Sequence, residues 1–225
     1  MAIRPAARHY QDRGSTLITA PAVEPVTLTE MRTHLRLHSN DTSEDAYLFN
    51  LIQEVREEIE QRIGRAIIEQ TWQLTIDHWP HGREPWWEGT KEAHIHVLHG
   101  NYGWLVLPKS PLISVESVTV YDEDSTAQSI NVPETFDIDT AQEPGRLALK
   151  SGQTWPVALR PTNAIEVVYK AGFATSADDV PGPLKRAVRN LVAYAYQYRG
   201  DCSSEAAMIA AGVKGVVDQY KVLKI

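Results

Sequence analysis

Apolar residues recur with a helical period near the beginning of the chain, directly after residues 27–30 (TLTE). This segment matches a capping box, in which Thr27 is the N-cap and the side chain of Glu30 reaches back to it. The apolar stripe that follows, at spacings of three and four, consists of Leu28, Met31 and Leu35. The pattern predicts a first helix that fades near His38, where the sequence SND is typical of a turn.

A second and longer helix is predicted from about Ser43 to Ile63. Its apolar stripe consists of Leu48, Ile52, Val55, Ile59 and Ile63. Glu44 and Asp45 stand at the N-terminal end, where the helix dipole favours negative charge. Gly64 is the expected C-terminal stop, because glycine readily adopts the left-handed conformation that ends many helices.

Between residues 65 and 173 the hydrophobic period changes from helical to two. Short alternating segments that are bounded by turn residues are typical of half-buried strands. They lie at residues 71–77, 95–98, 104–107, 115–121, 136–139, 146–149 and 165–169. Because no helical pattern separates these segments, they predict an antiparallel sheet or a small sandwich.

A helical period returns after Pro181 and Pro183, which are tolerated in the first turn of a helix. We expect this third helix to end at Gly200. Residues 201–225 begin with a weak alanine-rich helical pattern and end in a short apolar and basic stretch. That stretch is too short to form a core by itself.

The order of these elements predicts an α+β fold. It is a small helical bundle with a β-rich antiparallel insertion between the second and third helices, plus extended N- and C-terminal arms. The N-terminal arm has prolines and no apolar period, so we expect it to be disordered or ordered only against a partner. The predicted boundaries are residues 1–26 for the arm, 27–64 and 181–200 for the helical bundle, 65–173 for the insertion, and 201–225 for the tail.

The composition of the 225 residues is that of a globular protein, and its charge is acidic. Twenty-two Lys and Arg residues against 29 Asp and Glu residues give a net charge of −7, which makes a general binder of DNA phosphates improbable. The single Cys202 excludes an internal disulfide and a CxxC zinc motif. No apolar run has the length of a membrane span or of a signal peptide, so we expect synthesis in a reducing cytoplasm and no membrane partner.

Histidines and tryptophans in the insertion are the candidates for chemistry or binding. His94 and His96 share one face of a predicted strand and His99 follows, so a third ligand from a neighbouring strand would complete a metal site. An exposed polar strand face explains the same pattern. Trp86 and Trp87 lie in a predicted loop, where aromatic residues often anchor protein–protein contacts.

No catalytic motif stands out from the rest of the sequence. It contains no GxSxG elbow, no GxxxxGK[ST] phosphate loop and no HExxH motif. The clustered carboxylates have no spacing that would pair them on a substrate, and solvated turns explain them. We therefore expect a protein that is not an enzyme and that needs no cofactor.

Several segments together resemble a known family. PVTLTEMRTHLRL, DAYLFNLIQEVREEIEQRIGR, LPKSPLISVESVTVYDED, IEVVYKAGF and VPGPLKRAVRNLVAYAYQYR follow one another in the order found in head–tail connector proteins, also called adaptor or head-completion proteins. These proteins belong to long-tailed phages and phage-derived gene transfer agents. The resemblance covers about residues 21–200 and concerns the longer form, which has a β-rich insertion.

The resemblance implies a structural role. Members form a ring, typically of twelve subunits, which docks under the portal protein and extends the DNA channel. The next connector, stopper or tail protein attaches to the ring, and double-stranded DNA passes through without sequence-specific binding. The expected location is the head–tail neck of a virion or gene transfer particle, after synthesis in the cytoplasm of a bacterial host.

Candidate sites follow from this interpretation. On the second helix, Glu54, Glu57, Glu58 and Glu60 are expected to face the channel or a neighbouring subunit, because like charge repels DNA. Trp86 and Trp87 form the expected partner-contact loop. The expected portal contact consists of Val216, Val217, Tyr220, Lys221, Leu223 and Lys224, whose lysines suit an acidic partner.

Two other functions remain open at this point. The first is a non-catalytic binding module that uses Trp86 and Trp87 to hold a glycan or a protein partner. The second is a metal-dependent enzyme built on His94, His96 and His99.

Overall fold

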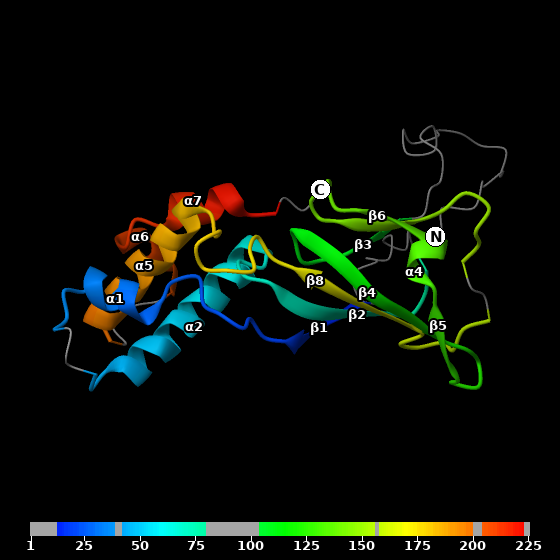
Figure 1. Cartoon of the computed structure of the whole chain (residues 1–225), viewed down its shortest axis with the longest axis horizontal. Coiled ribbons are helices and arrows are strands. Elements are labelled where there is room, and N and C mark those ends of the chain that lie inside the picture. The colour runs from blue at the N-terminus through cyan, green and yellow to red at the C-terminus, as the bar shows by residue number, and fades with distance from the viewer. Residues whose placement is uncertain (1–12, 39–41, 80–103, 156–157, 200–203, 223–225) are drawn as a thin grey trace, which may run out of the picture. The chain divides into compact units, whose positions relative to one another are not determined.

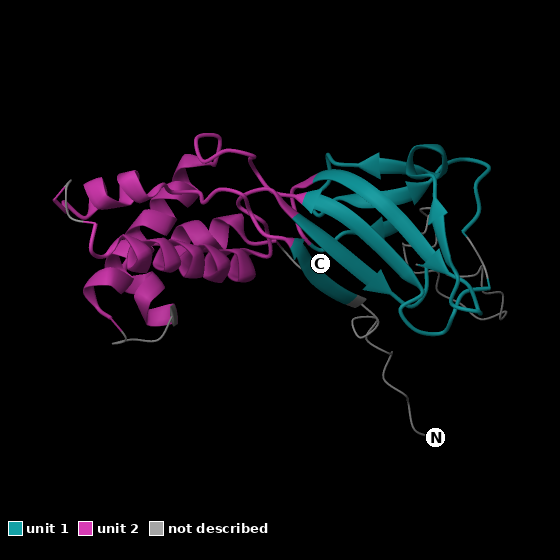
Figure 2. Cartoon of the chain, turned by 60° about the horizontal axis from the view of Figure 1, so that its bottom comes forward, with its two compact units in different colours: residues 1–18, 71–108, 113–170 teal, residues 19–70, 109–112, 171–225 magenta. Residues whose placement is uncertain are grey.

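The computed structural model describes residues 13–38, 42–79, 104–155, 158–199 and 204–222. The chain folds into two compact units (Figure 2). The β unit contains residues 1–18, 71–108 and 113–170, and the helical unit contains residues 19–70, 109–112 and 171–225. Each unit is therefore assembled from segments that are distant in the sequence.

The helical unit begins with the predicted capping box. α1 (Leu28–His34) has Thr27 as its N-cap. The backbone N–H of Thr27 donates to the Glu30 carboxylate at 2.8 Å, and the N–H of Glu30 donates to the Thr27 hydroxyl at 3.2 Å. The helix ends four residues before the predicted His38, because Arg36 adopts a left-handed conformation with φ of 58°.

Among the described residues this unit has four further helices: α2 (Asp45–Ile63), α5 (Gly182–Gln197), α6 (Ser204–Ala210) and α7 (Lys214–Tyr220) (Figure 1). α2 packs against α1, α5 and α7, and α5 also contacts α6. The predicted apolar stripe of α2 is confirmed, since all five of its residues are buried. Gly64 ends α2 with φ of 72°, as predicted.

The C-terminal segment takes part in the core of the helical unit. Met208, Val213 and Val217 are buried in the same cluster as the apolar faces of α2 and α5. The N–H of Val222 donates to the carbonyl oxygen of Ile63 at 2.8 Å, which ties the chain after α7 to the end of α2. The sequence pattern predicts a tail that forms no core by itself. Each short helix contributes too few apolar residues for the pattern to indicate which other helices it packs against.

The β unit contains two sheets. The order of the five-stranded sheet is β1 (Arg13–Thr19), β2 (Gln70–Ile76), β8 (Ile165–Ala171), β4 (Leu112–Tyr121) and β5 (Ala127–Ile130). The antiparallel three-stranded sheet has the order β3 (Trp104–Val106), β7 (Arg146–Leu149) and β6 (Phe136–Asp139), and the short helix α4 (Val132–Thr135) precedes β6. The predicted α+β fold is confirmed, and every strand of the described residues except β1 lies between α2 and α5 in the sequence.

Alternation along the strands places the core of the β unit. In β8 the odd-numbered residues from Ile165 to Ala171 are buried and the residues between them are half-buried. In the smaller sheet the buried Leu147 stands opposite Leu105 on one side and Ile138 on the other. The predicted strand at residues 95–98 lies outside the described residues.

β1 occupies part of the segment that the sequence analysis assigned to an extended arm. Residues 13–19 are paired with β2 at the edge of the larger sheet. Residues 14–19 are all exposed, so the strand is held mainly by its backbone pairing with β2. Such a strand has no apolar alternation, and a pattern search therefore overlooks it.

Gly172 is required where the chain leaves β8. Its N–H donates to the carbonyl oxygen of Pro111 at 2.9 Å, and its φ of +154° is one that residues with a side chain rarely adopt. A Cβ at this position would lie 2.6 Å from the backbone nitrogen of Glu69. The backbone after β8 and the backbone before β2 thus approach each other too closely for any other residue.

Gly172→Ala is expected to lower the free energy of unfolding by about 2–3 kcal/mol, through steric overlap with backbone atoms and an unfavourable φ. Urea unfolding followed by far-ultraviolet circular dichroism measures the change. Gly182→Ala is the control, because a Cβ at Gly182 meets no atom within 4 Å. It should leave stability within about 1 kcal/mol of wild type. Equal effects of the two substitutions would contradict this account of Gly172.

Candidate functional site

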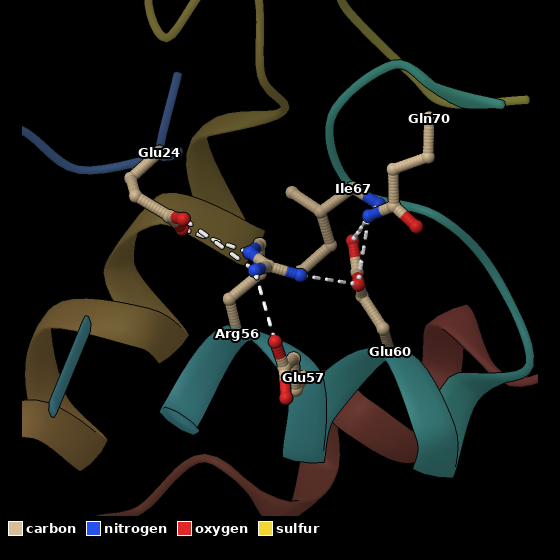
Figure 3. A network of polar contacts seen from close by, with 6 residues as sticks. All are labelled: Glu24, Arg56, Glu57, Glu60, Ile67 and Gln70. Carbon is tan, nitrogen blue, oxygen red and sulfur yellow. Dashed lines mark hydrogen bonds and ion pairs between the residues drawn. The ribbon is translucent and has the colours of Figure 1, made fainter. Parts of the chain in front are cut away.

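A buried polar network lies in the helical unit on one side of α2 (Figure 3). Arg56 is only 3% exposed and Glu60, one turn later, is 5% exposed. The Arg56 Nη1 atom donates to Glu60 Oε2 at 2.9 Å, and Arg56 Nε donates to Glu24 Oε2 at 2.8 Å. Arg56 Nη2 reaches the same Glu24 carboxylate at 3.4 Å and the exposed Glu57 at 3.3 Å. One guanidinium therefore holds three carboxylates.

Glu60 is the second centre of the network. Its carboxylate accepts the backbone N–H of Ile67 at 2.7 Å and the side-chain amide of Gln70 at 2.8 and 2.9 Å. A buried carboxylate is costly unless donors of this kind surround it. The network joins the segment before α1, α2 itself and the start of β2, because Glu24, Arg56 and Gln70 come from these three places.

Burial and charge act in opposite directions on these groups. Burial raises the pKa of Glu60, and the Arg56 charge and the hydrogen bonds from Gln70 and Ile67 oppose that rise. Burial by itself would lower the pKa of Arg56, but its ion pairs with Glu24 and Glu60 raise it above the ordinary value. Burial also lowers the pKa of Lys109, against the opposing charge of Glu60. The ion pairs with Glu24 and Glu60 thus favour the charged form of Arg56 in the folded protein.

Of the four acidic residues predicted on the surface of α2, the structure places Glu60 in the interior. Glu54 and Glu57 are exposed. Glu58 is half-buried and lies 3.5 Å from Arg62. Glu54, Glu57 and Glu58 follow one another at helical spacing, so they share the face of α2 that points away from its apolar stripe. This set is called the α2 acidic face below.

The predicted portal-binding residues divide in a similar way. Val217 is 4% exposed and belongs to the core of the helical unit. Val216 and Tyr220 are half-buried, and the Tyr220 ring lies edge-on to Phe173 with 5.9 Å between ring centroids. Lys221 is exposed. Leu223 and Lys224 lie outside the described residues.

The candidates for chemistry in the insertion also lie outside the described residues. This concerns the Trp86 and Trp87 loop and the histidines His94, His96 and His99. Within the part of the chain that the structure describes, no three His, Cys, Asp or Glu side chains are grouped so that they could hold a metal ion. In the same part, no helix has both the length and the apolar character that a membrane span needs.

An exposed aromatic cluster joins the beginning of α2 to the end of α5, and the sequence analysis did not identify it. Arg199 Nη2 lies 2.7 Å from the Glu44 carboxylate, which also accepts the hydroxyl of Tyr196. The Arg199 guanidinium stands 4.5 Å from the centroid of the Tyr47 ring. Nothing in the local sequence links residues 44 and 199, so only the packing of α2 against α5 reveals the cluster.

Comparison with known proteins finds a family model that matches the region containing α1, α2 and the α2 acidic face. Residues 25–131 match the model of the phage gp6-like head–tail connector proteins. The resemblance noted in the sequence is thereby confirmed. The family is one of structural connectors rather than of enzymes.

Solved structures share the fold of the connector region and of the rest of the chain. The neck of an empty GTA particle, computed with C6 symmetry, contains a chain with a TM-score of 0.69 and 22% identity over 94% of this chain and 97% of that one. A chain in the virion of a native gene transfer agent particle has a TM-score of 0.68, 20% identity and coverages of 94% and 96%. A chain in the neck of a native GTA particle, computed with C12 symmetry, has a TM-score of 0.66, 21% identity and coverages of 93% and 97%. No curated protein matches this sequence.

Arg56→Met is expected to lower the free energy of unfolding by about 3–5 kcal/mol, because it leaves the buried carboxylates of Glu24 and Glu60 without their cation. Urea unfolding measures the effect. Lys214→Met is the matched control, since Lys214 also pairs with an acid four residues later, at 3.5 Å, but with both side chains about half exposed. Solvent screens that pair, so the control should change stability by no more than about 0.5 kcal/mol. A similar small change for both variants would contradict a stabilising role of the network.

Proposed function

We propose that this protein is a head–tail connector in the neck of a tailed phage or phage-like gene transfer particle. In this role it forms a ring under the portal protein, extends the DNA channel and supports attachment of the next connector, stopper or tail protein. The observation that carries the proposal is the match of residues 25–131 to the connector family, together with a fold shared over 94% of the chain with a chain of a GTA neck.

A ring of twelve copies is part of the proposal. The necks in which similar chains occur were computed with C6 and C12 symmetry. A cyclic ring of more than two copies requires a heterologous interface, in which one surface of each copy contacts a different surface of the next. A chain with two units and unlike faces on each is suited to this kind of contact, since its opposite sides need not be complementary to themselves.

We assign the α2 acidic face to the wall of the DNA channel. It supplies Glu54, Glu57 and Glu58, and the ring would repeat them in every copy. Repeated negative charge repels the phosphate backbone, so DNA can move through the ring without adhering to it. The net charge of −7 on the whole chain supports the same role. Glu60 is left out of this assignment because its carboxylate is used inside the network.

We assign the portal contact to the end of the chain. After α7 the exposed Lys221 is followed by Val222, whose N–H is bonded to Ile63, and then by the last residues including Leu223 and Lys224. Tyr220 and Val216 are half-buried and retain some accessible apolar surface at this end. Val217 is a core residue that anchors α7, so in this assignment it holds the contact residues in place without touching the portal protein itself.

The assembly of the wild-type chain with the portal protein of its own particle tests the proposed function. Light scattering and negative-stain electron microscopy should show rings with a central hole, either alone or on the portal. Lys221→Glu/Lys224→Glu is expected to weaken portal binding at least tenfold, since two cations meeting an acidic partner become anions. Lys221 is exposed, so its replacement should not disturb the packing of the helical unit, and circular dichroism of the variant checks that the fold is kept.

The control for portal binding is Arg186→Glu, which reverses an exposed charge on α5. It should leave portal binding unchanged. A protein that stays monomeric with and without the portal would overturn the ring. Rings that bind the portal equally well with Lys221→Glu/Lys224→Glu would overturn only the assignment of the contact to the C-terminal residues.

Rings of Glu54→Lys should retain double-stranded DNA that wild-type rings release, because every copy then presents a cation to the phosphates. The added affinity should fall steeply with salt, as counterion release requires. Retention of a linear DNA fragment on immobilised rings measures it at several salt concentrations. Glu123→Lys makes the same charge change on an exposed turn of the β unit. If both variants retain DNA to the same extent, the α2 acidic face does not line the channel.

A further inference from the structure

β1 is held in its sheet in an unusual way. From Gly14 to Thr19 every side chain is exposed, including Leu17 at 40% and Ile18 at 52%. The strand occupies the edge of the five-stranded sheet, with β2 as its neighbour. Its attachment therefore rests on one ladder of backbone hydrogen bonds and on no buried side chain. Segments of this kind open at low free-energy cost.

The edge that β1 presents also lacks the usual protection. Arg13 at the start of β1 is its one charged residue, and residues 14–19 (GSTLIT) carry neither a charge nor a proline. Natural proteins use charged residues and prolines to prevent an exposed strand edge from pairing with another chain. The sequence of residues 14–19 therefore contains no feature that would hinder their pairing with the sheet edge of another chain.

The path of the chain separates β1 from the rest of its sheet. Residues 1–18 belong to the β unit, but the chain then runs through the helical unit and returns to the β unit only at residue 71. Residues 20–27 contain no helix or strand and include Pro21 and Pro25. The Arg56–Glu24 ion pair fixes this segment on the helical side. Between Thr19 and Glu24 the chain spans up to about 17 Å, which exceeds three strand spacings.

We propose that β1 is an exchange strand, which in the assembled ring pairs with β2 of the neighbouring copy instead of β2 of its own chain. The inference rests on the proposed ring. Every copy offers an identical β2 edge, so the exchanged strand forms the same hydrogen bonds that it forms here. Each copy donates one strand and accepts one, which is the heterologous pattern that closes a ring. When β1 leaves β2 of its own chain, that hydrogen-bonded pairing is lost. In a ring the β2 edge of the neighbouring copy is held close by, and this high effective concentration favours the replacement pairing.

The position of Gly14 provides a direct test. A Cβ on Gly14 would lie 4.0 Å from the Cβ of Thr75 in β2, which is within the range of a disulfide. Gly14→Cys and Thr75→Cys are made as separate single variants in a Cys202→Ser background, with different affinity tags. The two chains are co-expressed and assembled into rings, and mild oxidation is followed by non-reducing gel electrophoresis.

Exchange predicts a covalent dimer of the two differently tagged chains. It also predicts a ladder of covalent multimers when one chain carries both cysteines. The inference is overturned if the mixed single variants give no interchain product and the double variant closes only within each chain. Pairing of β1 with its own β2 gives that second result.

Thr119→Cys and Ser129→Cys are the matched control pair, because these residues stand directly opposite each other in the β4–β5 hairpin. They should link within one chain and give no product between chains. Light scattering on the same samples reports assembly independently. Rings without interchain disulfides would overturn the exchange alone, whereas the absence of rings in the wild type would overturn the proposed function. Interchain dimers that never form rings would support the exchange and contradict the ring.

Discussion

The buried ion pair between Arg56 and Glu60 is the constraint on which the helical unit depends. Two charges in the interior are tolerated only if every donor and acceptor is matched, and here Glu24, Gln70 and the Ile67 N–H complete the set. Because the partners come from before α1 and after α2, the network fixes how the chain enters and leaves the long helix. Apolar packing of α2 on α5 stabilises the helical unit, and the network fixes where the segments before and after α2 lie against this helix.

α2 is the element that connects stability with the proposed function. Its apolar stripe forms the core, one flank holds the Arg56 network and the opposite surface is the α2 acidic face. A channel wall must keep its charges at fixed positions while DNA passes, and a helix that is anchored on two sides meets this need. Glu57 takes part in both roles, since it contacts Arg56 and stays exposed.

The two ends of the chain differ in how they are secured. The C-terminal segment is anchored by Val217 and by the Val222–Ile63 hydrogen bond, so it can present Lys221 from a fixed base. β1 has no buried side chain and relies on backbone pairing. A connector needs both kinds of end in the proposed assembly: a stable one that meets a partner of different sequence, and an exchangeable one that links identical copies.

The capping box at Thr27, the apolar stripe of α2, the alternation in β8 and the resemblance to head–tail connector proteins over about residues 21–200 can all be recognised in the amino-acid sequence, because they are local patterns with a known period, spacing or order. Only the tertiary structure decided that Glu60 lies inside, that Val217 belongs to the core and that residues 13–19 form a strand. The physical reason is common to all three. Whether a side chain or a backbone edge meets solvent depends on which distant segment covers it, and no periodicity within a segment carries that information. Glu54 and Glu60 occupy the same helix in the same acidic sequence, yet Ile67 and Gln70 cover one of them and leave the other exposed.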